Sequence, residues 1–297
     1  PLVATAAQWI EGARPRTLPA AVAPVVIGTA AAMVLGRHSM GYALLALVVS
    51  TSLQIAVNYA NDYSDGIRGT DADRAGPARL TGGRLADPRN VKFMAFLFFF
   101  IAGLAGFALV ALTSSWILLL LGALAIIAAW RYTGGDNPYG YRGLGEVYVF
   151  VFFGLFATLG TLWTQAKEIT LAGILGAVGV GAVAAAILVA NNLRDIPTDT
   201  EHGKQTLAVR LGERRTRLFY GALIAVSVAC IIGISFVYPL TLIALLALAI
   251  LWKPYQAIRS GATGRDLIPA LGATGIYELA YAVLLSIGIV LSDQLFG

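Results

Sequence analysis

The sequence predicts an all-α protein that crosses a lipid bilayer about nine times. Of its 297 residues, 58% are hydrophobic and 12% are charged, about half the charged share of an average soluble domain. Apolar runs of roughly 20 residues, the length of a membrane-spanning helix, recur along the whole chain. Because so little sequence lies outside these runs, residues 1–297 are expected to form a single membrane domain.

The predicted elements follow one another in a regular order. Residues 1–16 are expected to form a short interfacial segment before the first span. Spans then follow at 17–36, 41–61, 91–112, 115–131, 145–164, 171–194, 217–237, 240–252 and 268–291. The eighth is short because Lys253 and Pro254 end its apolar run. Brief, nearly uncharged loops alternate with longer, charged ones at about 62–90, 132–144, 195–216 and 253–267.

The basic residues segregate to one side of this predicted topology. All of the 21 Lys and Arg residues except Arg37 and Lys167 fall on the side of the N-terminus. Cytoplasmic loops carry an excess of Lys and Arg, so the N-terminus and every long loop are expected in the cytoplasm and the C-terminus outside. Because the basic residues collect on one side of the membrane, the net charge of +5 is typical of a membrane protein with cytoplasmic loops. It does not by itself argue for nucleic-acid binding.

A polar stretch, Asn58–Asp71, closes the second apolar run. If this stretch is helical, four of its side chains share one face at positions i, i+3, i+4 and i+7: Asn58, Asn61, Asp62 and Asp65. Polar residues at the end of a membrane helix cost insertion energy and usually mark a site. We therefore expect a functional site at this end of the span.

A second polar stretch, Asn191–Lys204, closes the sixth span and repeats the pattern of the first. Both contain Asn-x-x-x-Asp followed by a further Asp: Asn61, Asp65 and Asp71 in the first, and Asn191, Asp195 and Asp199 in the second. The predicted topology places both stretches, here called the acidic stretches, on the cytoplasmic side.

The residue types in the acidic stretches indicate a particular chemistry. Carboxylates that converge at a membrane surface repel one another unless a cation neutralises them. Oxygen ligands suit Mg²⁺, which keeps several waters and bridges to substrate phosphates. Three interleaved cations would hold phosphate oxygens directly: Arg68, Arg74 and Lys204. The acidic stretches therefore predict a Mg²⁺–diphosphate site, and the alternative is two solvated loops whose charges pair among themselves.

The acidic stretches resemble the two aspartate-rich motifs of the UbiA superfamily of intramembrane aromatic prenyltransferases. The likeness extends along nearly the whole chain: Arg14–Pro19 resembles the segment before the first helix, and Tyr132–Gly135 with Gly143–Glu146 resembles the loop after the fourth helix in the menaquinone branch. The resemblance implies a helical bundle around a central cavity, in the bacterial cytoplasmic membrane. It also implies transfer of a polyprenyl group from polyprenyl diphosphate to 1,4-dihydroxy-2-naphthoate, with release of diphosphate and CO2.

The same resemblance implies roles for individual residues. The expected Mg²⁺ ligands are Asn61, Asp62, Asp65, Asp71, Asp195 and Asp199, although Asp62 could instead cap or pair locally. The expected substrate contacts are Arg14, Asn58, Arg68, Arg74, Asn192 and Lys204. Tyr132 and Glu146 are candidates for handling the acceptor, so the expected catalytic set is Asp65, Asp195, Asp199, Lys204, Tyr132 and Glu146. An apolar pocket would shield the allylic cation from water.

Other functions remain as alternatives at this point. One is a UbiA-type prenyltransferase with another aromatic acceptor. Another is a cation transporter, but transport sites lie near the membrane midplane and only Glu278 lies near the middle of a predicted span. The remaining tyrosines at the predicted cytoplasmic ends, such as Tyr139 and Tyr141, are most simply explained as interfacial belt residues.

Overall fold

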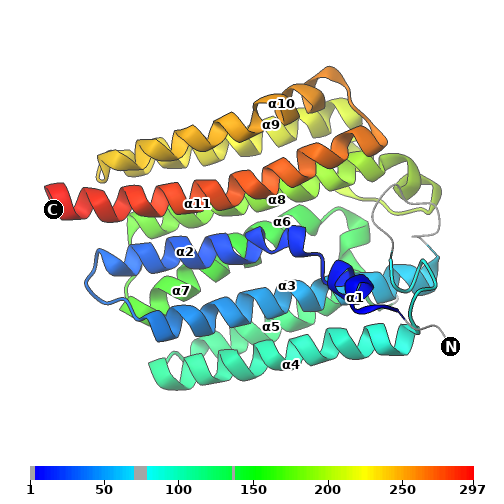
Figure 1. The fold of residues 1–297 in the computed structure, drawn as a ribbon, viewed down its shortest axis with the longest axis horizontal. Helices are drawn as coiled ribbons and strands as arrows, with labels where there is room; N and C mark the ends of the chain where they lie inside the picture. Colours follow the sequence, from blue (N-terminus) through cyan, green and yellow to red (C-terminus); the bar gives the residue numbers. More distant parts are fainter. Residues whose placement is uncertain (1–3, 70–78, 136–137) are drawn as a thin grey trace.

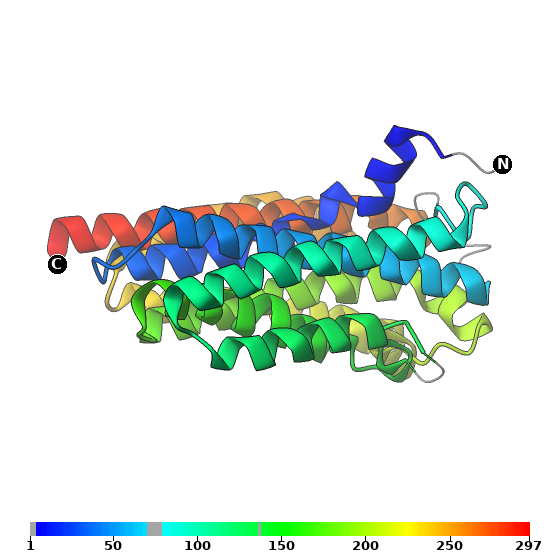
Figure 2. The same cartoon turned by 90° about the horizontal axis from the view of Figure 1, so that it is seen from below.

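The computed structural model describes residues 4–69, 79–135 and 138–297. These residues form helices joined by loops, with no strand among them, which confirms the all-α prediction. The helices run along one long axis, and α1 lies at the opposite end of the bundle from the C-terminus (Figures 1 and 2). A chain that starts at one end and finishes at the other crosses an odd number of times, as the predicted nine crossings require.

The helical elements have the following bounds. In chain order they are α1 (Ala6–Ala13), η1 (Pro15–Thr17), α2 (Pro19–Met33), α3 (Met40–Arg68), α4 (Pro88–Thr113), α5 (Ile117–Arg131), η2 (Tyr139–Arg142), α6 (Gly145–Val149), η3 (Phe150–Phe156), α7 (Ala157–Ala166), α8 (Leu171–Glu201), α9 (Leu207–Ser235), η4 (Pro239–Ala247), α10 (Leu248–Ser260), η5 (Gly264–Leu267) and α11 (Ile268–Phe296). Each predicted apolar run is helical in this arrangement.

The number of membrane crossings follows from helix length. Seven helical segments of the described chain are long and apolar enough to cross a membrane, and α2 adds an eighth when joined to Ala6–Thr17, from which it is bent by 48°. The remaining apolar helix, α5, has 15 residues, fewer than the roughly 20 that a span needs. The described chain is therefore compatible with nine crossings, and that number stays a prediction.

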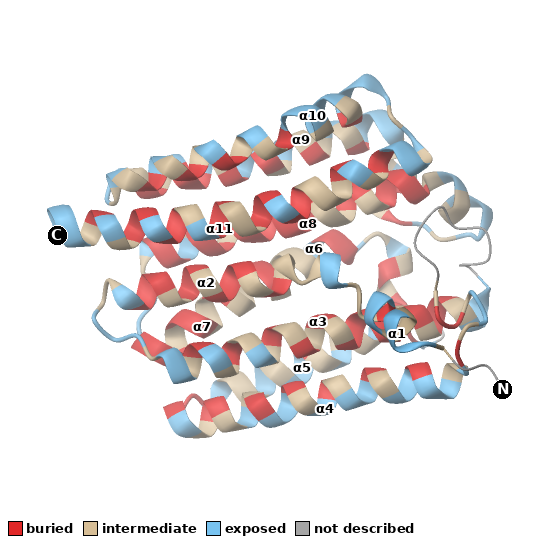
Figure 3. Ribbon diagram, viewed as in Figure 1, coloured by how far each residue is buried: buried red, intermediate tan, exposed pale blue. Residues whose placement is uncertain are grey.

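Helix α8 is the most buried of the spans, with 67% of its apolar window inside the protein. Helix α8 packs on α9 and also on the continuous segment α6–η3–α7, which it meets at small residues. A Cβ added to Gly154 would lie 2.5 Å from the Cα of Gly181, so the two backbones nearly touch, as small residues permit in membranes. Buried positions gather on α8 and α11, whereas α4 exposes large apolar side chains such as Phe93 and Phe100 (Figure 3).

Both acidic stretches continue their helices further than the sequence predicts. Helix α3 runs to Arg68 and ends at Gly69, whose φ of 75° is the left-handed conformation that commonly closes a helix. Helix α8 runs to Glu201, through Pro197. The charged loops predicted at 62–90 and 195–216 therefore begin later, and the predicted polar stripe of the first stretch lies on regular helix.

Candidate active site

The first acidic stretch occupies the last turns of α3. Asn58, Asp62 and Asp65 are buried and Asn61 is half-buried, as the shared helical face predicts. These four side chains nevertheless have different partners, most of which come from other parts of the chain. Two predicted site residues, Asp71 and Arg74, lie outside the described residues, so their roles stay predictions.

Asn58 attaches the N-terminal segment to α3. Its Nδ2 donates hydrogen bonds to the carbonyl oxygen of Ala13 and to Oγ1 of Thr17, both at 2.9 Å. These two residues flank Arg14, which has a left-handed φ of 54° at the end of α1. Asn58 therefore holds the turn that carries Arg14 against the first acidic stretch. The geometry favours this structural role over the substrate contact predicted for Asn58.

Asp62 holds the chain where it returns to α4. Its two carboxylate oxygens accept backbone N–H groups of Leu80 at 2.9 Å and Thr81 at 2.8 Å, and the residue is 1% exposed. The turn packs so closely that a Cβ on Gly66 would lie 2.5 Å from Thr81. Because both oxygens already accept backbone N–H groups, the local role foreseen as an alternative for Asp62 fits better than metal binding.

The second acidic stretch forms the last turns of α8. Arg194, buried beside Asp195, donates from Nε to Oδ1 at 2.6 Å and from Nη2 to Oδ2 at 2.8 Å. The same Nη2 donates to Oδ1 of Asn191 at 2.9 Å. A buried charge needs such partners, because an isolated one is expensive to desolvate. Arg194 was not among the predicted site residues, although it lies within the second stretch.

Lys204 brings the two acidic stretches together. Its Nζ lies 3.9 Å from Oδ2 of Asp65 on α3 and 3.9 Å from Oδ1 of Asp199 on α8. Both distances exceed a normal hydrogen bond, so the ammonium group lies between two carboxylates without close contact to either. The predicted placement of both stretches at one end of the bundle is therefore confirmed, and these three charges face one another.

The loop after α5 bridges the two acidic stretches. Thr133 Oγ1 donates to Oδ1 of Asn61 at 2.7 Å, and the Tyr141 hydroxyl donates to Oδ1 of Asp65 at 2.7 Å. The guanidinium of Arg68 donates to the carbonyl oxygens of Thr133 and Gly135. This loop therefore fixes three side chains of the first stretch that the sequence assigns to the site.

The Tyr141 ring is placed between cations. The Lys204 ammonium lies 4.8 Å from its centroid and the Arg68 guanidinium carbon 5.4 Å from it, both within the range of cation–π attraction. The carbonyl oxygen of Tyr141 accepts the backbone N–H of Gln205 at 3.0 Å. Tyr141 therefore contacts residues of both stretches, and its prediction as an interfacial belt residue missed this position. The only sequence signal was its place in the loop that resembles the menaquinone branch.

Tyr132 and Glu146, the candidates for handling the acceptor, lie at the α6 side of the site. Glu146 is buried, and its Oε1 accepts Nδ2 of Asn192 at 2.9 Å. The Tyr132 ring stacks on Tyr148 with centroids 6.0 Å apart. Tyr139 packs against both rings, and burial, followed by these two phenols, raises the pKa of Tyr139. An aromatic surface therefore joins the polar site to the membrane interior.

The donor set fits a magnesium ion. Carboxylate oxygens of Asp65 and Asp199 and the amide oxygen of Asn61 are the hard ligands that Mg²⁺ prefers. Asp195 offers the same oxygen chemistry, but both of its oxygens already accept hydrogen bonds from Arg194. Among the described residues, no three His, Cys, Asp or Glu side chains are already gathered as a metal cluster.

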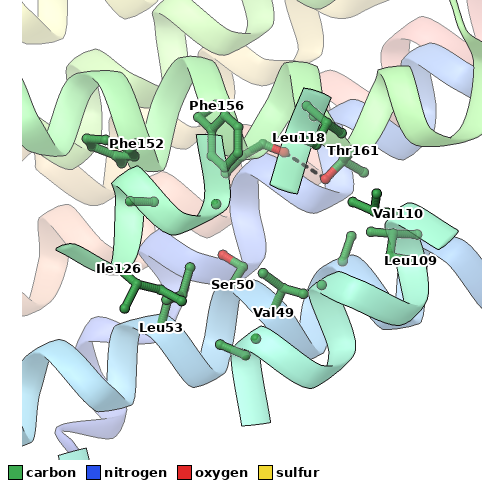
Figure 4. A pocket seen from close by; sticks show the side chains of 18 of the residues that line it. Val49, Ser50, Leu53, Leu109, Val110, Leu118, Ile126, Phe152, Phe156 and Thr161 are labelled. Atoms are coloured by element: carbon green, nitrogen blue, oxygen red, sulfur yellow. Dashed lines mark hydrogen bonds between the residues drawn. The ribbon is translucent and has the colours of Figure 1, made fainter. Parts of the chain in front are cut away.

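An apolar cavity of about 360 Å³ lies inside the bundle. Figure 4 shows its walls, formed by Val49, Ser50 and Leu53 of α3, Leu109 and Val110 of α4, Leu118 and Ile126 of α5, Phe152 and Phe156 of η3, and Thr161 of α7. The hydroxyls of Ser50 and Thr161 bond backbone carbonyls at 2.8 and 2.7 Å, which leaves the walls apolar. Val57, also in the lining, is eight residues before Asp65, about 12 Å along the helix.

A helical membrane bundle with paired acidic stretches above an apolar cavity is the architecture of an intramembrane prenyltransferase. Residues 21–266 match the UbiA prenyltransferase family. The chain therefore belongs to this family, as its two acidic stretches predict, and it is an enzyme of the prenyltransferase class.

Within the family, the chain is similar to proteins that share one name. The chain is 51% identical over 281 residues to 1,4-dihydroxy-2-naphthoate octaprenyltransferase of Mycobacterium tuberculosis, covering 95% of this chain and 96% of that protein. It is 42% identical to the enzyme of the same name from Escherichia coli, covering 75% of this chain and 74% of that protein.

Solved structures show the same fold. A UbiA homolog from Aeropyrum pernix superposes with a TM-score of 0.69 at 18% identity, covering 93% of this chain and 98% of that one. A UbiA homolog from Archaeoglobus fulgidus bound to GPP and Mg²⁺ has a TM-score of 0.69 at 16% identity, covering 95% and 99%. The predicted UbiA-type bundle is confirmed.

Proposed function

We propose that this chain is a Mg²⁺-dependent enzyme that transfers a polyprenyl group from polyprenyl diphosphate to 1,4-dihydroxy-2-naphthoate. The reaction releases diphosphate and CO2 and gives demethylmenaquinol for menaquinone biosynthesis. Identities of 51% and 42% to proteins named for that acceptor support it. The GPP- and Mg²⁺-bound archaeal homolog supports a prenyl diphosphate donor held with the metal.

The observation that carries the proposal is the meeting of Asp65, Asp199 and Lys204 in a bundle that also encloses an apolar cavity. Lys204 and Arg68 would bind the phosphate oxygens of the donor as charge-assisted hydrogen-bond donors. The bound metal would be held by Asn61, Asp65, Asp71, Asp195 and Asp199, and it would neutralise the departing diphosphate. The apolar walls exclude water, which would otherwise capture the allylic carbon when its C–O bond breaks.

The apolar cavity would bind the hydrocarbon tail of the donor, and the aromatic surface would bind the acceptor. The walls formed by α3, α4, α5 and η3 fit the hydrocarbon tail of the donor. Tyr132 and Glu146 would contact the aromatic acceptor as it approaches the diphosphate, and the face of Tyr132 would stabilise positive charge on the prenyl carbon. Attack by the naphthoate ring carbon forms the new C–C bond, and loss of CO2 restores the aromatic ring.

The proposed location follows from the distribution of charge. The N-terminus and the acidic stretches would face the cytoplasm and the C-terminus the outside of a bacterial cytoplasmic membrane, because nearly all Lys and Arg residues lie at the end of the bundle that carries the site. A soluble aromatic acid and a lipid-soluble donor could then reach the same site from water and from the bilayer.

The test uses purified protein in lipid nanodiscs with farnesyl or longer diphosphate, 1,4-dihydroxy-2-naphthoate and Mg²⁺. Mass spectrometry should detect the prenylated, decarboxylated product, and EDTA should abolish it. Asp65→Asn and Asp199→Asn should lower the rate by on the order of a hundredfold or more, because each removes a charge at the site. Asp266→Asn, an exposed acid of η5 at the same end of the bundle, should leave the rate unchanged.

Two results would contradict the proposal. Wild-type protein that binds Mg²⁺ yet forms no product from any of these donors would exclude the naphthoate reaction. Full activity of Asp65→Asn would show that the meeting point of the acidic stretches is not the site of chemistry. A panel of other aromatic acids in the same assay separates this reaction from prenyl transfer to another acceptor.

A further inference from the structure

A basic depression lies between α9 and α10, away from the candidate active site. Its volume is about 540 Å³, and Arg214 and Arg217 of α9 and Arg259 of α10 contribute to its walls. Helices α9 and α10 lie side by side along one edge of the bundle (Figure 1). The depression is at the end that carries the acidic stretches, since α9 begins three residues after Lys204.

Arg217 builds the floor of this depression. Its Nη1 donates to the carbonyl oxygen of Ile258 at 2.6 Å, and its Nη2 donates to that of Ala262 at 2.8 Å. The same Nη2 lies 3.0 Å from Oε2 of Glu213, the one acid in the lining. Arg217 therefore fastens the end of α10 to α9 and pairs with the negative charge at this place.

The other two arginines of the depression are available to bind a ligand. Arg214 and Arg259 are exposed, and neither has a hydrogen bond or ion pair with any described residue. Arg214 also lies in the first turn after Gly212, where a φ of 72° interrupts α9 and a new run of helix begins. The positive end of that helix adds to the attraction for an anion. Two free guanidinium groups in one depression favour a phosphate, which each can bind through two hydrogen bonds.

The surface next to these arginines is apolar. Leu218, 67% exposed, and Tyr255, 38% exposed, line the depression together with the arginines. Trp252, 68% exposed, is three residues before Tyr255 on α10, about one helical turn further from the charged end. Exposed Trp and Tyr side chains are typical of the boundary between lipid and water. The depression is therefore charged on its outer side and apolar on the side toward the membrane interior, which suits an amphipathic ligand better than a soluble anion.

We propose that this depression binds the headgroup of an anionic phospholipid. The phosphate would lie between Arg214 and Arg259, and the acyl chains would run along Leu218 and Trp252. The charge of the two free arginines and the adjoining apolar surface carry this assignment. It is independent of the reaction proposed above and involves no bond breaking.

The experiment is a lipid titration followed by native mass spectrometry of the detergent-purified protein. Phosphatidylglycerol and phosphatidylcholine with identical acyl chains are compared on wild type, on Arg214→Gln/Arg259→Gln, and on a control. The control, Arg215→Gln/Arg265→Gln, removes two exposed arginines from the same end of the bundle but outside the depression. Phosphatidylglycerol binding should weaken roughly thirtyfold in the first double variant, because each arginine near the surface contributes about 1 kcal/mol. The control should bind as wild type does.

Three outcomes would overturn the proposal. They are equal binding of the two lipids by wild type, equal weakening in the control, and displacement of the lipid by inorganic phosphate or diphosphate at the lipid's own concentration. The last would indicate a site for soluble anions. Thermal unfolding of both double variants checks folding, and it should match wild type because Arg217, which fastens α10, is retained.

Discussion

At the scale of single residues, neighbours in the sequence have different tasks. Asp62 and Asp65 are three positions apart on the same helix, yet Asp62 accepts two backbone N–H groups of the 80–81 turn while Asp65 accepts the Tyr141 hydroxyl and faces Lys204. The difference comes from what packs against each side chain. A carboxylate with both oxygens engaged by backbone holds the fold, whereas one that faces a cation at 3.9 Å can still take a new partner.

Tyr141 gives the sharpest prediction at this scale. Tyr141→Phe keeps the ring between Lys204 and Arg68 but removes the hydroxyl that positions Asp65. A hydrogen bond to a charged group contributes about 1.5–3 kcal/mol, so kcat/KM should fall roughly tenfold to a hundredfold. The Mg²⁺ concentration for half-maximal rate should rise, which steady-state assays in nanodiscs would measure.

Tyr139→Phe is the matched control. Tyr139 is in the same loop and, like Tyr141, is half-buried, but its hydroxyl donates to the carbonyl oxygen of Ala128 at 2.8 Å, away from the acids. This variant should lose about 1 kcal/mol of stability and keep the wild-type Mg²⁺ dependence. An equal loss of rate in both variants would show that the loop only needs to be packed and that the Tyr141–Asp65 bond has no special role.

At the scale of elements, close contact between backbones fixes the position of the site. The segment α6–η3–α7 meets α8 where Gly154 faces Gly181. Glu146 and Asn192 meet further along the same two helices, about two turns from Gly154 and about three turns from Gly181. The seven-residue π-helical run Phe150–Phe156 lies in the same segment, and such wide turns shift the register of a helix. Phe152 and Phe156 of this run then face the apolar cavity.

The glycine contact predicts a difference between two identical substitutions in this segment. A Cβ at Gly154 would lie 2.5 Å from Gly181, whereas a Cβ at Gly160 would meet no atom within 4 Å. Gly154→Ala should therefore lower stability by about 1–3 kcal/mol through overpacking. Gly160→Ala should be neutral or slightly stabilising, because alanine favours helix by about 0.5–1 kcal/mol. Thermal unfolding in detergent compares them, and equal melting temperatures would contradict the close packing of α8.

At the scale of the whole molecule, the orientation in the membrane is the main open prediction. His38 and His202 are exposed at opposite ends of the bundle, and the single cysteine, Cys230, is buried. In a Cys230→Ser background, His38→Cys should react with a membrane-impermeant thiol reagent in intact cells. His202→Cys, beside the second acidic stretch, should react only after the membrane is opened.

The reverse labelling pattern would place the acidic stretches outside and would contradict the distribution of Lys and Arg. Labelling of both cysteines in intact cells would instead indicate a permeable membrane. A third variant with Cys230→Ser alone measures the background, which should be near zero.

Much of this architecture is readable from the sequence because the bilayer imposes simple rules. Apolar length predicts the helices, and the distribution of arginine and lysine predicts that both acidic stretches lie at one end. The i, i+3, i+4 and i+7 spacing of Asn58, Asn61, Asp62 and Asp65 predicts their common face on α3. These are properties of local sequence or of the solvent around it, so no knowledge of tertiary contacts is needed.

The contacts between distant segments were decided only by the tertiary structure. Tyr141 and Asp65 are 76 positions apart, and no local sequence pattern around either residue predicts that they are in contact. Asn58 holds the N-terminal turn, Asp62 the turn before α4, and Lys204 lies between two helices. By itself, therefore, the sequence determined the helical membrane bundle and the position of the two acidic stretches within it, and it predicts their chemistry. The packing of helices and loops decided which of those polar groups hold the fold and which face the site, because a side chain's partner depends on what the chain brings beside it.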